Sequence, residues 1–312
     1  MKALAQVEPA TQVKAPFPWF GGKSRAAALV WERFGDVPNY VEPFAGSLAV
    51  LLARPTAPRT ETVNDKDFYL ANFWRAVSID PEAVAAAADW PVNEIDLHAR
   101  HRWLLEQSSF REKMLADPEY YDAKIAGFWV WGISAWLGDD WCRRTDNPEK
   151  AHKKRPHLNR WMGINTKRAR DLHAYFLEIQ ARLRRVRVAC GDWYRVCGDT
   201  PTAKIGLTGV FLDPPYFVNR KMKYNEDTQG LSSEVREWAL ARGDDPKFRI
   251  ALCGYEGEHD MPESWEFVPW KAHGVYGWLG VGEGQQNRHR ERVWFSPHCL
   301  KPDMQLRAVE SL

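Results

Sequence analysis

The stretch Gly209-Val210-Phe211-Leu212-Asp213-Pro214-Pro215-Tyr216 is a short apolar run that ends in a turn with one acid, two prolines and an aromatic ring. Such a run is typical of a buried strand. In an open parallel sheet, ligands bind beyond the carboxyl ends of the strands. The stretch therefore predicts an α/β sheet with a functional site directly after Leu212. The alternative is a turn with no role.

The residues of this turn suit chemistry on an exocyclic amine. Such an amine is a poor nucleophile, because its lone pair is delocalised into the base, and its attack requires acceptors for both N–H bonds. Asp213 and a nearby backbone carbonyl can supply them, while Pro214 and Pro215 fix φ and remove backbone donors. Tyr216 offers a stacking face to an extracted base, worth about 1–3 kcal/mol.

Working outward, strands and helices alternate on both sides of a long helical segment. Between residues 82 and 183 helical periodicity dominates, ending in a helix at about 167–184, and no strand is predicted. A helix at 232–240 begins with a cap at Ser232. The remaining predicted elements are strands at 41–44, 60–63, 185–189, 209–212, 248–253, 265–268 and 291–295 and helices at 47–53 and 68–78.

These elements predict one α/β domain with an insertion. We expect a Rossmann-like sheet built from residues 16–81 and 184–299, interrupted by a helical insertion at 82–183. Residues 1–15 are expected to form a flexible N-terminus and residues 300–312 a tail. The length of 312 residues and the 45% hydrophobic content suit a packed core of this size.

Three further sequence features exclude other classes of protein. No apolar run approaches the ~18 residues of a membrane span, and residues 1–14 lack the layout of a signal peptide. The five cysteines are scattered without a CxxC pair, which indicates reduced thiols, no metal site and a cytoplasmic protein.

Positive charge is concentrated in residues 143–170. This segment holds ten Lys or Arg residues and two acidic residues, a net charge of +8 in a chain of +2 overall. A basic stripe attracts a phosphate backbone. It is equally compatible with a solvated helical face.

Two other strand ends carry acids that could hold a cofactor. The turn Val41-Glu42-Pro43-Phe44-Ala45-Gly46-Ser47 joins a strand to a helix whose first N–H groups are expected to be free. Asp65 ends the next strand, nineteen residues after Gly46, where an acid can hold ribose hydroxyls. Asp192 and Trp193 follow a third strand and could bind an adenine ring. Each is also compatible with an ordinary turn.

In this order, the motifs resemble those of the DNA adenine methyltransferase (Dam-like) family. Phe17-Pro18-Trp19-Phe20-Gly21-Gly22-Lys23 precedes Tyr40-Val-Glu-Pro-Phe-Ala-Gly46, then Val63-Asn64-Asp65, a helical insertion, Gly191-Asp192 and Asp213-Pro-Pro-Tyr216. The resemblance covers about residues 16–296. The chain departs from many members at Gly46-Ser47-Leu48, where they have a glycine-rich run, and it matches the family's Asn-His-Asp region only loosely at 252–260.

The resemblance implies a base-flipping enzyme that transfers a methyl group from S-adenosylmethionine to N6 of adenine at specific sites in double-stranded DNA. Trp19 and Lys23 would contact the methionine end of the cofactor, Asp65 the ribose and Asp192 the adenine ring. The full set of expected cofactor contacts is Trp19, Gly22, Lys23, Glu42, Pro43, Phe44, Ala45, Gly46, Asp65, Asp192, Trp193 and Asp213. Asp213, Pro214, Pro215 and Tyr216 would be catalytic.

DNA contacts are expected in three places. The first is the basic insertion, with Trp161 and Asn165 as candidates for base contacts. The second is a flap behind the catalytic turn, and the third is an arginine-rich loop before the last strand, where the resemblance also places DNA. The residues are Lys153, Lys154, Arg155, Arg160, Trp161, Asn165, Lys167, Arg168, Lys221, Lys223, Tyr224, Arg288 and Arg290.

Several alternatives stay open at this point. N4 methylation of cytosine requires the same two acceptors, and RNA or protein glutamine amides are substrates of related sites. The basic, tryptophan-rich insertion favours duplex DNA over a protein amide. A non-catalytic DNA-binding module with the same fold is a further alternative. We expect a monomer or weak dimer, with any accompanying restriction activity on another chain.

Overall fold

A computed structural model describes residues 13–19, 22–136, 141–143, 163–165, 171–216, 226–269 and 290–301. Its centre is a seven-stranded sheet in the order β3-β2-β1-β4-β5-β7-β6. The strands are β1 (Asn39–Glu42), β2 (Thr60–Asp65), β3 (Val186–Cys190), β4 (Thr208–Leu212), β5 (Phe248–Tyr255), β6 (Glu266–Pro269) and β7 (Glu291–Phe295).

The sheet is mostly parallel, with an antiparallel β6–β7 hairpin at one end. β1 pairs in parallel with both β2 and β4, and β5 continues the parallel order beside β4. β7 runs antiparallel to β5 and to β6. This mixed α/β sheet is consistent with a methyltransferase fold, as the sequence predicts.

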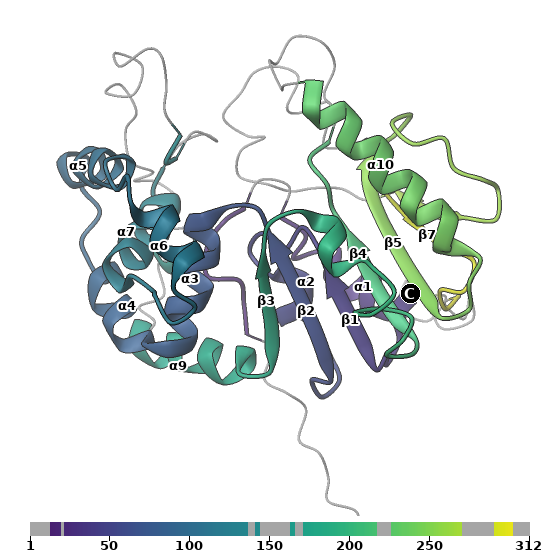
Figure 1. Ribbon diagram of the computed structural model, residues 1–312, viewed down its shortest axis with the longest axis horizontal. Coiled ribbons are helices and arrows are strands. Elements are labelled where there is room, and N and C mark those ends of the chain that lie inside the picture. Colours follow the sequence, from purple (N-terminus) through teal and green to yellow (C-terminus); the bar gives the residue numbers. More distant parts are fainter. Residues whose placement is uncertain are drawn as a thin grey trace, which may run out of the picture.

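Both faces of the sheet are buried, because successive side chains of a strand point to opposite faces. Tyr40 and Phe211 lie in the core on one face, whereas Val41 and Val210 lie in the core on the other. The first face is covered by α1 (Ala27–Phe34), α2 (Ala49–Leu52) and α3 (Phe68–Ile79). The second is covered by η2 (Trp193–Val196) and α10 (Glu226–Gly243) (Figure 1).

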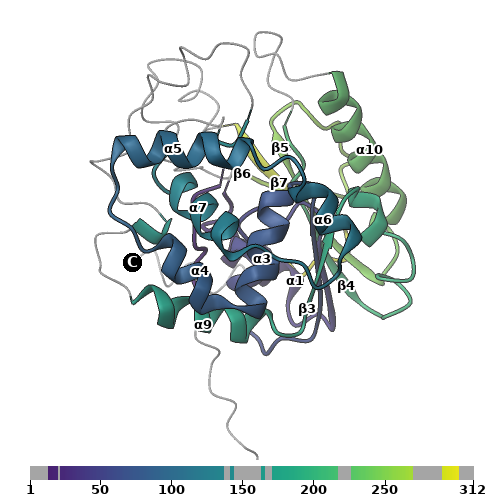
Figure 2. The ribbon, with the colours of Figure 1, turned by 60° about the vertical axis from the view of Figure 1, so that its left-hand side comes forward.

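A group of helices lies between α3 and β3 in the chain. Figures 1 and 2 show them gathered next to α3 at the β3 end of the sheet. They share one continuous core with the first face of the sheet, through Phe73 and Trp74 of α3 and Trp129 of α7. The elements are α4 (Pro81–Ala88), α5 (Glu94–Leu105), α6 (Phe110–Ala116), α7 (Ala123–Ile133), η1 (Gly163–Asn165) and α9 (Leu172–Leu183).

A buried ion-pair network fixes the end of this helical group on the sheet. Glu61 of β2 is 1% exposed and accepts hydrogen bonds from both terminal nitrogens of Arg182 in α9, at 2.7 and 2.9 Å. Arg54 donates to the same carboxylate at 3.2 Å. Removing one partner of such a network would leave an uncompensated buried charge, so the network specifies how α9 packs. The predicted division into domains stays a prediction.

The predicted elements agree with the structure to within a few residues at most boundaries. Residues 291–295 form a strand as predicted, and no strand occurs in the described part of 82–183. The cap at Ser232 is wrong, because α10 begins at Glu226. Ser232 therefore lies inside the helix, where its hydroxyl donates to Glu258 at 2.8 Å.

Several helices begin at acids or amides that cap them. Asp67 accepts from the backbone N–H groups of Tyr69 and Leu70 at the start of α3. Asp80 accepts from Ala83, and Pro81 occupies the first turn of α4. Each such cap satisfies backbone donors that the helix leaves unpaired and contributes about 1 kcal/mol. These caps set where α3 and α4 begin.

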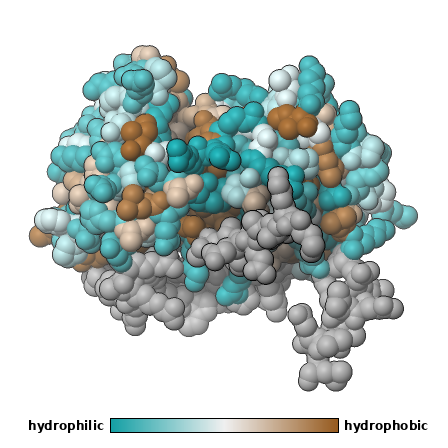
Figure 3. Space-filling model, turned by 90° about the horizontal axis from the view of Figure 1, so that it is seen from below, coloured by the Kyte–Doolittle hydropathy of each residue, from teal (hydrophilic) through white to brown (hydrophobic). Residues whose placement is uncertain are grey.

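The surface seen in Figure 3 is mainly hydrophilic, with hydrophobic residues in small separate spots. Among the described helices, none combines the length and apolarity that a bilayer crossing requires. All five cysteines are free thiols, three of them buried.

Gly132 provides a test of the packing of the helical group. A Cβ added there would lie 1.8 Å from Cζ2 of Trp141. Alanine ordinarily favours a helix over glycine by about 1 kcal/mol, but here the overlap decides the sign. We expect Gly132→Ala to lower the free energy of unfolding by about 1–3 kcal/mol, measured by denaturant titration.

The matched control for this substitution is Gly198→Ala, because an added Cβ at Gly198 meets nothing within 4 Å. That variant should unfold at nearly the wild-type denaturant concentration. Equal stability of the two variants would show that the Trp141 ring does not pack against α7 as described.

Candidate active site

The carboxyl ends of three neighbouring strands meet at one edge of the sheet. β1 is hydrogen-bonded to β2 and to β4, with Val41 opposite Val210 and Glu42 opposite Val63. The turn after β1, the acid that ends β2 and the Asp213 turn after β4 therefore lie side by side, although up to 170 residues separate them in the chain. The parallel order of the sheet produces this cluster.

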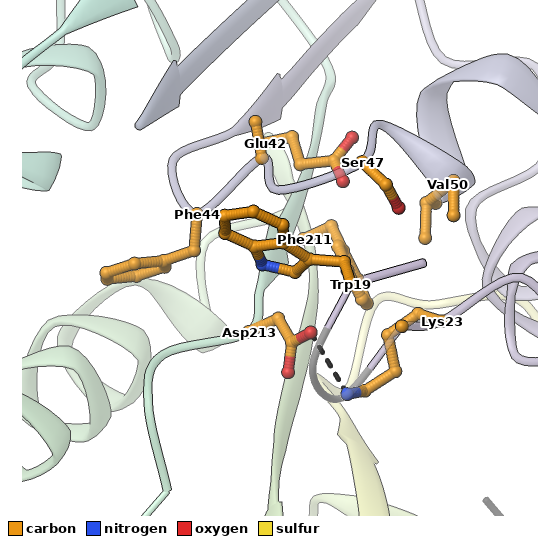
Figure 4. Close-up of a pocket in the computed structure, with 11 residues that line it drawn as sticks. Trp19, Lys23, Glu42, Phe44, Ser47, Val50, Phe211 and Asp213 are labelled. Carbon is orange, nitrogen blue, oxygen red and sulfur yellow. Dashed lines mark ion pairs between the residues drawn. The ribbon is translucent and has the colours of Figure 1, made fainter. Parts of the chain in front are cut away.

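A hollow of about 240 Å³ opens between these strand ends (Figure 4). In this view Lys23 and Asp213 turn toward one another, with Glu42 across the hollow from them. The lining residues are Trp19, Gly22, Lys23, Glu42, Phe44, Ala45, Ser47, Ala49, Val50, Phe211 and Asp213.

A buried ion pair joins the N-terminal segment to the catalytic turn predicted from the sequence. Nζ of Lys23 lies 3.0 Å from Oδ2 of Asp213, and the lysine is 4% exposed. The hydroxyl of Tyr216 donates to Oδ1 of Asp213 at 2.7 Å, and Lys23 lies 5.0 Å from the centre of the Tyr216 ring. Burial alone lowers the pKa of Lys23, but the carboxylates of Asp213 and Glu291 outweigh it and raise the pKa.

Glu42 is a second carboxylate at the hollow. It is 2% exposed, and it accepts a hydrogen bond from the hydroxyl of Tyr40 at 2.9 Å. Burial raises the pKa of Glu42 to about 8, because the hydrogen bonds from Tyr40 and the Leu51 backbone offset only part of the desolvation. A cation close to Glu42 would favour the charged form of this carboxyl group.

Asn64 and Asp65 tie the strand ends together. The side-chain amide of Asn64 donates to the carbonyl oxygens of Pro43 and Gly191, both at 3.0 Å. Asp65 accepts from the backbone N–H of Gly46 at 3.0 Å and from that of Asp67 at 3.0 Å. Burial raises the pKa of Asp65 to about 6, and the charge of Asp67 adds to the effect.

These bonds correct one expectation about the first turn. The sequence suggested that the helix start at Ser47 leaves backbone N–H groups free. The N–H of Gly46 is instead used by Asp65, that of Ala45 by the carbonyl of Asn64, and that of Leu48 by the carbonyl of Ala45. Helix α2 begins only at Ala49.

The backbone of the same turn is left-handed at two positions. Gly46 has φ +47°, and a Cβ there would lie 2.5 Å from the Trp19 ring. Leu48 has φ +56° although it carries a side chain, which is fully buried. A left-handed leucine is strained, and burial of its side chain offsets that strain. This explains how the chain makes the turn without the glycine-rich run of many Dam-like proteins.

Asp192 and Trp193 follow β3 as predicted, but their side chains diverge. Asp192 is exposed and caps η2 by accepting from the N–H of Tyr194 at 2.9 Å. Trp193 is buried in the core of the second face, where it stacks on Phe44 with ring centres 6.0 Å apart. Trp193 therefore packs against the Phe44 ring inside the core. Of the two residues, only Asp192 has a side chain that a ligand can reach in the described structure.

Most of the expected DNA-contacting residues lie outside the described residues. Arg290 is described: it is exposed, donates to the carbonyl of Glu256 at 3.1 Å and lies over the Tyr255 ring at 5.9 Å. The backbone of Asn165 ends the short turn η1. The remaining expected DNA contacts lie outside the residues that the structure describes. They are Lys153, Lys154, Arg155, Arg160, Trp161, Lys167, Arg168, Lys221, Lys223, Tyr224 and Arg288.

The tryptophans of the insertion need a correction. From the sequence, the tryptophan-rich composition of the insertion was expected to favour duplex DNA as the substrate. Trp129, Trp131, Trp136 and Trp141 are at most 7% exposed, and the rings of Trp136 and Trp141 pack on one another and on His101. These four rings therefore build the core of the helical group and do not present faces to a base.

Three residues beside Asp213 were not predicted from the sequence. Tyr255 and Cys253 end β5, and the Tyr255 ring meets the Tyr216 ring edge-on at 4.8 Å. Glu291 starts β7 and lies 4.0 Å from Nζ of Lys23. The signal in the sequence for Glu291 was an acid at the start of a predicted strand. This signal points to the site only if that strand runs antiparallel to its neighbours.

Comparison with known proteins agrees with this geometry. Residues 19–122 match the family model described as D12 class N6 adenine-specific DNA methyltransferase. This range contains the Trp19–Lys23 segment, the turn after β1 and the end of β2, and it stops before Asp213. No curated protein matches the chain. Over residues 19–122 the chain is therefore similar to the D12 class of N6-adenine DNA methyltransferases, which use S-adenosylmethionine, and its seven-stranded sheet is consistent with a methyltransferase fold.

Proposed function

We propose that the chain methylates N6 of adenine at specific sites in duplex DNA, with Asp213 and Tyr216 at the reacting amine. The observation that carries this proposal is the hollow at the ends of β1 and β4, where Asp213, Lys23 and Glu42 converge. S-adenosylmethionine supplies the methyl group as an electrophile when it is bound there. The other steps are performed by side chains of this protein.

The donor set of the hollow fits the methionine end of the cofactor. This end carries an ammonium, a carboxylate and a sulfonium. Glu42 offers a buried carboxyl group that becomes a negative partner when a cation binds beside it, and Lys23 offers a positive partner for an anion. The rings of Trp19 and Phe44 also line the hollow, and aromatic faces attract cations such as a sulfonium.

Asp65 and Asp192 are our candidates for the nucleoside end. Asp65 already accepts two backbone N–H bonds, which fix its carboxylate at the end of β2. Each carboxylate oxygen can accept a further bond, so ribose hydroxyls can be added to this arrangement. Asp192 is exposed beside the Phe44–Trp193 stack, in reach of a ring that lies along it.

Asp213 would accept one N–H bond of the target amine and a backbone carbonyl of the Pro214–Pro215 turn the other. Both acceptors favour the tetrahedral nitrogen that forms as the amine attacks, so their effect falls on the transition state. Adenine must leave the duplex to reach them. Tyr216, braced edge-on by Tyr255, gives the extracted base a stacking face.

We assign the DNA surface to the basic insertion, the segment after Tyr216 and the loop before β7. One contact supports the first assignment: a Cβ added at Gly163 in η1 would lie 2.6 Å from the carbonyl oxygen of Pro16. Gly163, one of the few described residues of the basic segment, thus lies against the residues that lead into Trp19. We further propose that residues 82–183 act as the target-recognition unit of a cytoplasmic monomer or weak dimer.

A methyl-transfer assay tests the function. The protein is incubated with unmethylated plasmid DNA and labelled S-adenosylmethionine, and the DNA is digested to nucleosides. We expect label in N6-methyldeoxyadenosine, and methylation-aware sequencing will give the site. Label in N4-methylcytosine, or cofactor binding without transfer, contradicts the proposal.

Replacing Asp213 tests the chemical role of the turn. We expect Asp213→Asn to slow methyl transfer by about 100-fold or more, because one acceptor of the amine becomes a poor one. Cofactor affinity should stay within a few fold of wild type, since Asp213 acts mainly on the transition state. Single-turnover kinetics and calorimetry measure the two effects. Near-normal transfer by a folded variant would remove Asp213 from the mechanism.

Glu42 generates a prediction about protons. With a pKa of about 8, Glu42 is mostly protonated at pH 7 in the free protein. A cationic group of the cofactor lowers that pKa, so binding at pH 7 should release protons. Calorimetry in two buffers of different ionisation enthalpy counts them. We expect Glu42→Gln to bind more weakly and with less proton release, and equal release by both proteins would reject this contact.

The basic stripe predicts a salt effect. If its side chains neutralise phosphates, the logarithm of DNA affinity falls with the logarithm of salt concentration by about 0.9 per contact. Lys153→Ala with Lys154→Ala should flatten this slope and weaken all sequences alike, because phosphate contacts do not specify sequence. The control pair is Lys204→Ala with Lys247→Ala, exposed before β4 and β5 at the opposite edge of the sheet. An unchanged slope in the first pair would show that these two lysines do not touch DNA.

A further inference from the structure

Glu291 is a buried carboxylate that the proposed reaction does not yet use. It is the first residue of β7 and pairs with Tyr255 across the antiparallel ladder. The residue is 6% exposed, and its Oε2 has no hydrogen-bond partner among the described residues. A buried carboxylate oxygen without a partner is costly, so this position calls for an explanation.

The nearest cation to Glu291 is shared with the catalytic turn. Nζ of Lys23 lies 3.0 Å from Asp213 and 4.0 Å from Oε2 of Glu291. The first distance is a hydrogen bond and the second is too long for one. Lys23 thus lies between two carboxylates, bonded to one and about 1 Å short of a bond with the other.

The proposed reaction places a conflicting demand on Asp213. Its Oδ1 already accepts from Tyr216 and its Oδ2 from Lys23. A directly bonded ammonium draws electron density from the carboxylate that has to stabilise positive charge growing on the amine nitrogen. Moving Lys23 away from Asp213 strengthens Asp213 as an acceptor, provided that the ammonium keeps a partner out of water.

We infer that Glu291 is a positioning residue, which takes over the ammonium of Lys23 when Asp213 engages the target amine. This inference rests on the proposed function. It accounts for both the unbonded Oε2 and the 4.0 Å gap. Glu291 itself touches neither adenine nor cofactor in this scheme and acts through Lys23 alone.

The scheme makes the reaction depend on the charge of Glu291. The groups that face this carboxylate are Lys23, Asp213, Tyr216, Cys253 and Tyr255, with Arg290 behind the Tyr255 ring. Burial raises the pKa of Glu291 to about 7, since Lys23 offsets only part of the desolvation and Asp213 adds to it. Above this pH Glu291 is charged and attracts Lys23, and below it Glu291 is neutral and does not. The rate should therefore rise as pH increases through about 7.

The test compares single-turnover methylation of adenine by wild type, Glu291→Gln and Glu291→Asp across this pH range. Cofactor is kept saturating, so that the titration of Glu42 does not enter through binding. We expect Glu291→Gln to be about 10- to 100-fold slower above pH 7, to lose the rise near pH 7, and to keep wild-type cofactor affinity. Glu291→Asp, which keeps the charge, should retain the rise at a lower rate.

The matched control is Glu256→Gln, which removes a carboxylate just after the end of β5. The Glu256 carboxylate pairs with Arg292 at 3.0 Å, and its side chain is 62% exposed. This variant should leave rate and pH profile unchanged. A Glu291→Gln variant that keeps the wild-type profile, at an equal or uniformly reduced rate, overturns the inference. An inactive wild type overturns the proposed function and the inference with it, so the two failures are distinguishable.

Discussion

The buried ion pair between Lys23 and Asp213 is the interaction on which the site depends. Placing two charges out of water is expensive, and the arrangement is stable only if geometry and further hydrogen bonds compensate. Asp213 meets this condition through Tyr216, and Lys23 through its position between Asp213 and Glu291. The pair connects a segment that precedes the sheet to the end of its fourth strand, so the N-terminal motif and the Asp213 turn form one unit.

The sheet supplies the frame for this pair. Strands β2, β1 and β4 are parallel neighbours, so their carboxyl ends deliver Asp65, Glu42 and Asp213 to one edge. Asn64 then fixes the spacing of these ends by donating to both Pro43 and Gly191. The family match of residues 19–122 covers the half of the site that would hold cofactor, and the turn after β4 supplies the other half. The two halves of the candidate site thus come from separate strands that the fold brings together.

The helical group combines two kinds of residue with different roles. Its buried tryptophans extend the core of the sheet, and the Arg182–Glu61 pair fixes the last helix to β2. Its basic residues lie mainly in the segment between α7 and α9. A tightly packed aromatic core resists deformation, so the described helices form a rigid base next to the sheet.

The sequence by itself determined the sheet-forming strands, the strand that leads into Asp213, the acid that ends β2 and the family resemblance, because apolar periodicity and turn residues are local signals. Only the tertiary structure decided the rest. Glu291 joins the site because β7 runs antiparallel, which brings the start of that strand to the edge where the other strands end. The tryptophans look alike in sequence whether they bind bases or fill a core, and only packing separates the two. Leu48 is left-handed because its buried side chain compensates for a strained backbone, a balance between distant residues that no local pattern records.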